Sequence, residues 1–249
     1  MYLTTKGLVL RETQYKENDK LLSVLSDELG LITAKARGVK NKNSKLRSGC
    51  QLLGYSSFAL YEKNGYYTIT EAEPLELFSG LRLDIELLSL GSYFAQVIES
   101  VSTEGQANPE VLALGLNSLY ALDTLKKPQK LVKAVFELRL MCLSGFAPML
   151  DGCGCCGGGD ASLFLLQDGV LSCDVCRKTF GNSEIKRLTP GVLAAMRHVV
   201  ECEKQKLFSF TLAEEPLGLF AETAEAFLLT QLGQGFSSLN FYKRLFTTI

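Results

Sequence analysis

The pattern of apolar and polar positions along the chain changes near Pro74. Before this proline, short apolar or alternating segments predict β-strands. These segments run over residues 8–10, 21–25, 31–37, 51–61 and 66–72. The last two flank Asn64-Gly65, a dipeptide that favours a hairpin turn because both residues tolerate a positive φ. Such closely spaced short strands predict a small barrel over residues 1–78, with an OB-fold as the leading candidate.

After Pro74 the apolar spacing becomes helical. Asp84 is a predicted N-cap, and Asn108-Pro109 and Thr189-Pro190 each place a capping residue before a proline at the first helical position. Helices are therefore expected over residues 84–101, 108–125, 128–145, from 189 onward, and over 217–232. The chain is thus predicted to be an α+β multidomain protein whose second, helical domain covers residues 79–249.

The formal net charge is only −1, but the charges are unevenly distributed. No acidic residue lies between Glu28 and Glu62, and six basic residues fall within this interval: Lys35, Arg37, Lys40, Lys42, Lys45 and Arg47. Most of them lie in the connection between the third and fourth predicted strands. A run of this kind faces either water or an anion, so a solvated loop and an anion-binding surface are the two interpretations.

Two Cys-x2-Cys knuckles, Cys153-Gly-Cys-Cys156 and Cys173-Asp-Val-Cys176, are separated by sixteen residues. This spacing is typical of a zinc site with four thiolate ligands, because each knuckle presents two sulfurs on a tight turn. Apolar residues on both sides of Asp168-Gly169 predict a β-hairpin between the knuckles, as in a zinc ribbon. We therefore expect Cys153, Cys156, Cys173 and Cys176 to hold one structural Zn²⁺ in an element over about residues 150–180.

Alternatives to this ligand set stay open. Cys155 is a possible substitute for Cys153 or Cys156, although its spacing suits a knuckle less well, and the thiols can also stay without a metal. The segment from Gly152 to Gly157 spells the dinucleotide-binding pattern Gly-x-Gly-x-x-Gly, but it lacks the flanking strand and helix of a βαβ unit. The remaining cysteines, which lie in apolar contexts and are interpreted as buried thiols, are Cys50, Cys142 and Cys202.

The sequence offers no set of catalytic residues. It contains neither a Gly-x4-Gly-Lys-Ser/Thr phosphate loop nor a Gly-x-Ser-x-Gly nucleophile elbow. Its single histidine, His198, is followed by two valines, which excludes the His-x-Glu motif of zinc deaminases, and we interpret it as a surface or capping residue.

We also find no signal-peptide pattern and no apolar stretch of about 18 residues, so we expect a cytoplasmic protein with reduced cysteines.

Several segments match one known family in order and spacing. Lys6-Gly-Leu-Val-Leu10, Tyr15-x-Glu17-x-Asp19-x-Leu21-Leu22, Glu28-x-Gly30, Ala36-Arg37-Gly38-Val39 and Lys42-x-Ser44-Lys45-x-Arg47 precede Phe136-Glu-Leu-Arg-Leu140, Gly145-Phe146-x-Pro148 and the two knuckles. Each segment is a weak signal, but the ordered set, which extends over most of the chain, resembles the RecO family of bacterial recombination mediators. Two departures are Asp168-Gly169, where the family often has a glycine pair, and the nearly neutral charge.

The resemblance implies a non-enzymatic DNA repair and recombination protein of the bacterial cytoplasm, associated with the nucleoid. It implies binding of single- and double-stranded DNA, annealing of complementary strands, and cooperation with RecR to place RecA on DNA that is coated by the single-stranded-DNA-binding protein. The six basic residues, Arg37 and Arg47 foremost, are then expected to neutralise phosphates. The tyrosines expected either to stack on bases or to pack the barrel are Tyr55, Tyr61, Tyr66 and Tyr67.

The family also contacts the acidic C-terminal tail of the coating protein. Lys130, Lys133 and Arg139 lie near apolar positions of a predicted helix and are candidates for this contact, with ordinary solvated helix charges as the alternative.

Two rival classes of function stay open beside the resemblance. A zinc-ribbon interaction or transcription-associated module would bind protein and show no strand annealing, whereas a metalloenzyme would need an open coordination position on its zinc.

Overall fold

The structure, a computed structural model, describes residues 1–247 and comprises two compact units. One unit contains residues 1–126 together with the C-terminal segment from Phe236, and the other contains residues 127–235. The sequence places a domain boundary after residue 78, and this boundary stays a prediction. The compact units divide after Lys126 and before Phe236, because two helices of the first unit pack against the barrel and a third packs against one of these helices.

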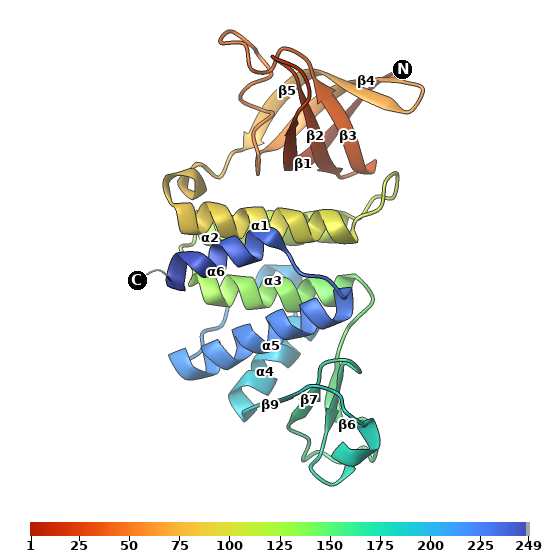
Figure 1. The fold of residues 1–249 in the computed structure, drawn as a ribbon, viewed down its shortest axis with the longest axis vertical. Coiled ribbons are helices and arrows are strands. Elements are labelled where there is room, and N and C mark those ends of the chain that lie inside the picture. The colour runs from red at the N-terminus through yellow and green to blue at the C-terminus, as the bar shows by residue number, and fades with distance from the viewer. Residues whose placement is uncertain (248–249) are drawn as a thin grey trace. The chain divides into compact units, whose positions relative to one another are not determined.

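Five strands of the first unit form a closed barrel in the order β1-β2-β3-β5-β4 (Figure 1). The strands are β1 (Tyr2–Gln14), β2 (Lys20–Ser26), β3 (Gly30–Ala36), β4 (Tyr55–Lys63) and β5 (Tyr66–Glu76). Strand β3 pairs in parallel with β5 and all other pairs are antiparallel. Asn64 and Gly65 join β4 to β5 with φ angles of 53° and 79°. The predicted barrel and its hairpin are therefore confirmed.

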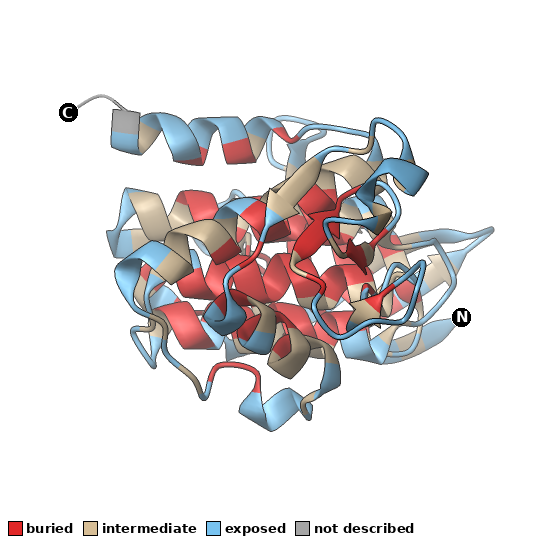
Figure 2. Ribbon diagram, turned by 90° about the horizontal axis from the view of Figure 1, so that it is seen from below, coloured by how far each residue is buried: buried red, intermediate tan, exposed pale blue. Residues whose placement is uncertain are grey.

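The barrel core follows from alternation along the strands. In β3, Ile32, Ala34 and Ala36 are buried, whereas Thr33 between them is exposed. Phe58 and Leu60 of β4 follow the same period of two. In Figure 2 the buried residues are concentrated in the helices and strands, whereas the connecting loops are mostly exposed.

The helices of the first unit are α1 (Ile85–Val101), α2 (Pro109–Asp123) and α6 (Ser237–Thr247), preceded by the 3-10 turn η1 (Ser79–Leu83). The predicted caps are present: the Asp84 carboxylate accepts hydrogen bonds from the N–H groups of Glu86 and Leu87, and Asn108 accepts one from Val111. Helix α6 packs against α1 and was not predicted from the sequence.

The second unit combines three helices with a four-stranded sheet. The helices are α3 (Gln129–Leu143), α4 (Pro190–Glu201) and α5 (Glu214–Leu232), with short 3-10 turns η2 (Cys176–Phe180) and η3 (Lys204–Lys206). The sheet, in the order β6-β8-β7-β9, contains β6 (Met149–Cys153), β7 (Leu163–Leu165), β8 (Val170–Ser172) and β9 (Ile185–Arg187). The predicted hairpin is β7–β8, while β6 and β9 were not predicted. Within residues 1–247, no helix is both long and apolar enough to cross a membrane.

A buried ion cluster joins α3 to α5 in the second unit. The Lys133 ammonium lies 2.8 Å from carboxylate oxygens of both Glu137 and Glu225, and Lys133 is only 5% exposed. Burial opposes the charge of the ammonium, but the two carboxylates outweigh this effect and raise the pKa of Lys133. Lys133 was a candidate for contacting the acidic tail of the coating protein, which requires a position on the surface. The structure contradicts this position, because Lys133 is buried and pairs with carboxylates of its own unit.

We predict that Lys133→Met destabilises the protein by about 3–5 kcal/mol, because it removes the cation that lies between the buried carboxylate of Glu137 and the partly buried carboxylate of Glu225. The urea midpoint of the full chain, followed by circular dichroism, measures the change. Lys130→Met is the matched control, since Lys130 is an exposed residue of the same helix, and it should change stability by about 0.5 kcal/mol or less. Equal midpoints for the two variants would contradict the assigned role of Lys133.

Candidate nucleic-acid interface and metal centre

The connection between β3 and β4, residues 37–54, is hereafter the basic loop, and Asp19 anchors its beginning. One Asp19 oxygen accepts a hydrogen bond from the Gly38 N–H at 2.8 Å, and the other lies 3.3 Å from the Lys35 ammonium. The Gly38 N–H, followed by Lys35, lowers the pKa of Asp19, so this carboxylate is ionised at neutral pH. Lys35 also lies 4.5 Å from the centroid of the Tyr15 ring.

Apolar residues of the basic loop fill one part of the barrel core. Val39, Leu46 and Cys50 are 3%, 9% and 2% exposed, and they belong to the same apolar cluster as Val9 and Phe58. Successive turns, closed by backbone hydrogen bonds from residues 41, 44, 47 and 50, connect these anchoring points. Lys40, Lys42, Lys45 and Arg47 lie between these anchoring points, and Arg37 precedes the first of them. These five cations are all exposed, whereas Lys35 of β3 is half-buried.

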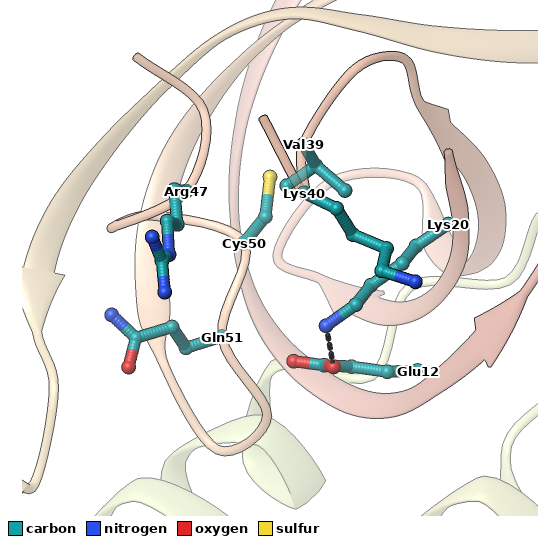
Figure 3. A pocket seen from close by; sticks show the side chains of 7 residues that line it. All are labelled: Glu12, Lys20, Val39, Lys40, Arg47, Cys50 and Gln51. Atoms are coloured by element: carbon teal, nitrogen blue, oxygen red, sulfur yellow. Dashed lines mark hydrogen bonds and ion pairs between the residues drawn. The ribbon is translucent and has the colours of Figure 1, made fainter. Parts of the chain in front are cut away.

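A hollow of about 480 Å³ opens where the basic loop meets β1 and β2 (Figure 3). It is lined by Glu12, Lys20, Val39, Lys40, Arg47, Cys50 and Gln51. Arg47 and Gln51 face the ion pair of Glu12 and Lys20 across the hollow. The Lys40 ammonium donates a hydrogen bond to Gln14 at 3.0 Å. The structure therefore brings Lys40 and Arg47 to one hollow, whereas Lys42 and Lys45 do not line it.

Exposed tyrosines continue this basic surface across the outside of the barrel. Tyr2 lies opposite Tyr61, Tyr61 opposite Thr68, and Thr68 opposite Lys35 in the strand register. Residues that lie opposite one another share a face, so these four form a row roughly 14 Å long across β1, β4, β5 and β3. The ring centroids of Tyr2 and Tyr61 are 5.1 Å apart, and Tyr2 is 74% exposed. Tyr2 was missed from the sequence because only the strand register brings it beside Tyr61.

The tyrosines named from the sequence differ in position. Tyr66, which is 79% exposed, and Tyr61 are available to a ligand. Tyr67 packs against the barrel core, and Tyr55 is half-buried in β4. The barrel therefore uses some of these rings for packing and presents others to solvent.

The two cysteine knuckles meet at the hairpin of the second unit. The sulfurs of Cys153, Cys156, Cys173 and Cys176 all lie within 4.8 Å of one another, and those of Cys156 and Cys173 are 3.9 Å apart. A backbone hydrogen bond from Gly154 to Leu171 ties the first knuckle to β8 at 2.8 Å. Four sulfurs in this arrangement can hold a metal ion, as the spacing predicted. Cys155 is exposed and does not belong to the group.

Local hydrogen bonds favour thiolate formation at one of these residues. Backbone N–H groups of Cys156, Cys173 and Cys155 lower the pKa of Cys153 to about 6. Hydrogen bonding to the sulfurs of Cys173 and Cys156 raises the pKa of Cys176. Neighbouring thiolates repel one another, so full ionisation of the group requires a cation among the sulfurs.

The other cysteines and the histidine have structural surroundings. Burial raises the pKa of the Cys50 thiol to about 12 and that of Cys142 to about 11. Cys142 and Cys202 are half-buried, so only Cys50 has the fully buried position expected for all three. His198 lies with Nε2 3.0 Å from the carbonyl oxygen of Lys206, and its ring packs against Phe210.

The three residues considered for a partner tail are not equivalent. Lys130 is exposed on α3, while Lys133 is buried in its ion cluster. The Arg139 guanidinium is half-buried and donates hydrogen bonds to the carbonyl oxygens of Val199 and Val200 at 3.1 and 2.8 Å. Arg139 thus satisfies carbonyl groups near the end of α4, a structural role that sequence reasoning did not detect.

A closed barrel with an attached basic loop, and a helical unit with a four-cysteine cluster, define a class of modular OB-like proteins with a candidate metal site. Comparison with known families is more specific. The family model for the N-terminal part of recombination protein O matches residues 1–78, and the model for its C-terminal part matches residues 82–240. The chain belongs to the RecO family of DNA repair proteins.

Individual relatives agree with this assignment. The chain is 32% identical over 249 residues to the DNA repair protein RecO of Acetivibrio thermocellus, an alignment that covers 98% of this chain and 97% of the relative. It is 34% identical over 178 residues to the RecO of Alkaliphilus metalliredigens, covering 71% of this chain and 72% of that protein. With the RecO of Heliobacterium modesticaldum it shares 33% identity over 209 residues, which cover 81% and 75% of the two chains.

We predict that Asp19→Ala loosens the basic loop, because it removes the acceptor of the Gly38 N–H and the anion beside Lys35. Tryptic cleavage after Arg37, Lys40 and Lys42, followed by mass spectrometry, should accelerate by about threefold or more at neutral pH. The anchor depends on an ionised carboxylate with a lowered pKa, so it should be lost only in acid, as the pH falls through that pKa. Glu17→Ala, at an exposed neighbouring residue, is the control, and equal acceleration in both variants would contradict the anchoring role of Asp19.

Proposed function

We propose that this chain is a non-enzymatic DNA-binding protein that holds single- and double-stranded DNA on its basic loop and anneals complementary strands. The observation that carries the proposal is the arrangement of this loop, whose apolar residues are fixed in the barrel while its cations face outward. Fixed cations lose little conformational freedom on meeting a polyanion. Membership of a DNA repair family supports DNA as that polyanion.

Binding in this proposal comes mainly from phosphate neutralisation. Each Lys or Arg that neutralises a phosphate releases condensed counterions, so affinity falls as salt concentration rises. The outward tyrosines Tyr2, Tyr61 and Tyr66 add base stacking, worth about 1–3 kcal/mol per base, which acts only on single strands. Annealing then needs no bond chemistry, because two strands that share a cationic surface repel each other less and meet more often.

The second part of the proposal concerns the metal. We infer that the four clustered cysteines hold one structural Zn²⁺. Thiolates are preferred zinc ligands, and a tetrahedron with Zn–S bonds near 2.3 Å places its sulfurs about 3.8 Å apart. The distance of 3.9 Å between Cys156 and Cys173 fits this requirement. When bound, the ion would offset two of the four thiolate charges and link β6 to the β7–β8 hairpin, and four protein ligands leave no position for a substrate.

The proposed partners follow from the family resemblance. They are RecR and the single-stranded-DNA-binding protein with its acidic C-terminal tail, with RecA as an indirect partner, in the bacterial cytoplasm at the nucleoid. For the tail, exposed Lys130 of α3 is the better of the original candidates, since Lys133 and Arg139 are engaged within their own unit. The rival function, a zinc-ribbon module that binds protein, is separated from this proposal by the DNA experiment that follows.

We predict that Arg37→Ala combined with Arg47→Ala weakens binding to single-stranded DNA by on the order of tenfold or more at low salt. The slope of log affinity against log salt should become shallower by about 1.4, since each neutralised phosphate contributes about 0.7 for single strands. Fluorescence anisotropy with a labelled oligonucleotide measures both quantities. Annealing of complementary strands, measured by energy transfer with and without the coating protein, should slow in parallel.

The matched control removes the same charge elsewhere, with Lys204→Ala and Lys206→Ala, both at exposed residues of η3. It should leave affinity and salt slope close to those of the unchanged protein. An unchanged slope in the Arg37 and Arg47 variant would mean that the basic loop is not the DNA interface. Failure of the unchanged protein to bind or anneal DNA at low salt would favour the protein-binding rival.

We predict about one zinc ion per chain, as measured by inductively coupled plasma mass spectrometry. Cys173→Ser should lower zinc content and the thermal stability of the β7–β8 region, because zinc binding supplies on the order of 10 kcal/mol toward ordering such elements. Cys155→Ser is the control and should retain the metal, since Cys155 lies outside the group. Zinc loss in the Cys155 variant equal to that in the Cys173 variant would overturn the ligand assignment.

A further inference from the structure

The hollow beside the basic loop has a lining in which cations outnumber anions. Its lining contains the cations Lys20, Lys40 and Arg47 and the single anion Glu12, a formal excess of two positive charges. Glu12 is already engaged, because one oxygen pairs with Lys20 and the other accepts a hydrogen bond from the Leu52 N–H at 2.7 Å. The excess charge therefore belongs to Lys40 and Arg47, on opposite sides of the hollow in Figure 3.

The rest of the lining is uncharged, and two of its residues are anchored in the barrel core. Val39 and Cys50 are 3% and 2% exposed and are packed into the barrel core. Gln51 lies beside Arg47 and offers an amide to a polar ligand. A volume of about 480 Å³ lies within the range of sites that hold small molecules.

We propose that this hollow binds the terminal phosphate of a DNA strand, with Arg47 and Lys40 as the phosphate ligands and Gln51 beside the terminal nucleotide. A terminal phosphomonoester carries about −1.5 to −2 charges at pH 7, which matches the excess of the lining, whereas each phosphodiester within a strand carries only one. The Arg47 guanidinium can donate two parallel hydrogen bonds to such a group. The inference rests on the proposed DNA binding and adds recognition of strand ends to it.

End recognition would separate the basic loop into two parts with different tasks. Lys42 and Lys45 are exposed and lie outside the hollow, so they meet backbone phosphates of any strand. Lys40 and Arg47 line the hollow and add a preference for a strand that ends there. A terminus held in this way gives a bound strand a defined starting point on the barrel.

The test compares one labelled oligothymidylate in three forms: with a 5′ phosphate, with a 3′ phosphate, and with hydroxyl groups at both ends. The full-length protein should bind at least one phosphorylated form about tenfold more tightly than the hydroxyl form, at a fixed salt concentration. Arg47→Ala, and independently Lys40→Ala, should remove this preference. Lys45→Ala is the matched control and should weaken all forms equally while it keeps the preference. Circular dichroism establishes that each variant folds.

The possible results separate the two proposals. If no form binds, the proposed DNA function itself fails. If all forms bind equally well to the unchanged protein, or if the preference survives both Arg47→Ala and Lys40→Ala, DNA binding stands and end recognition is overturned. Binding of thymidine 5′-monophosphate is measured as well, to test whether the hollow takes a free nucleotide. If it binds as tightly as the phosphorylated strand, the hollow belongs to a free nucleotide and the strand-end proposal is likewise overturned.

Discussion

A loop that carries clustered cations must be held in place against their mutual repulsion, and the barrel unit meets this constraint with apolar packing. Val39, Leu46 and Cys50 bring the basic loop back to the barrel core at three points. The Asp19 carboxylate fixes its first turn through Gly38 and balances Lys35. The remaining cations need no internal partner, because exposure to water and salt screens their repulsion. The result is a cationic surface that is ordered before any ligand arrives, so less conformational entropy is lost on binding.

The same constraint explains why net charge is a poor guide to this protein. A chain with a formal charge of −1 gives no indication of a polyanion ligand, whereas the interval between Glu28 and Glu62 contains only cations among its charged residues. Position within the loop then matters as much as charge. Lys35 is partly neutralised by Asp19, Lys40 and Arg47 share a hollow, and Lys42 and Lys45 do not. Residues that count equally toward the net charge therefore differ in their surroundings and in what they can bind.

Sequence alone predicted the features that depend on local chemistry. The Asn64-Gly65 turn, the Asp84 and Asn108 caps and the two cysteine knuckles each follow from neighbouring residues, and all are present. Features that depend on distant partners were missed. Strand β9 is three residues long and exists through its pairing with β7, and α6 is defined by its packing against α1. Lys133 illustrates the same limit, since its pattern suits a surface helix charge, whereas it is buried where α5 packs against α3 and brings Glu225 beside it.

The row from Tyr2 to Lys35 shows what strand register adds to the candidate interface. In the sequence, Tyr2, Lys35 and Tyr61 are far apart, and no motif connects them. The pairing of β1 with β4, β4 with β5 and β5 with β3 places them side by side on the outer face. A shift of one residue in any of these pairings would turn part of the row into the barrel, so the stacking surface depends on the core residues that set the register. The apolar core of the barrel thus determines both parts of the interface, because it anchors the basic loop and aligns the aromatic row.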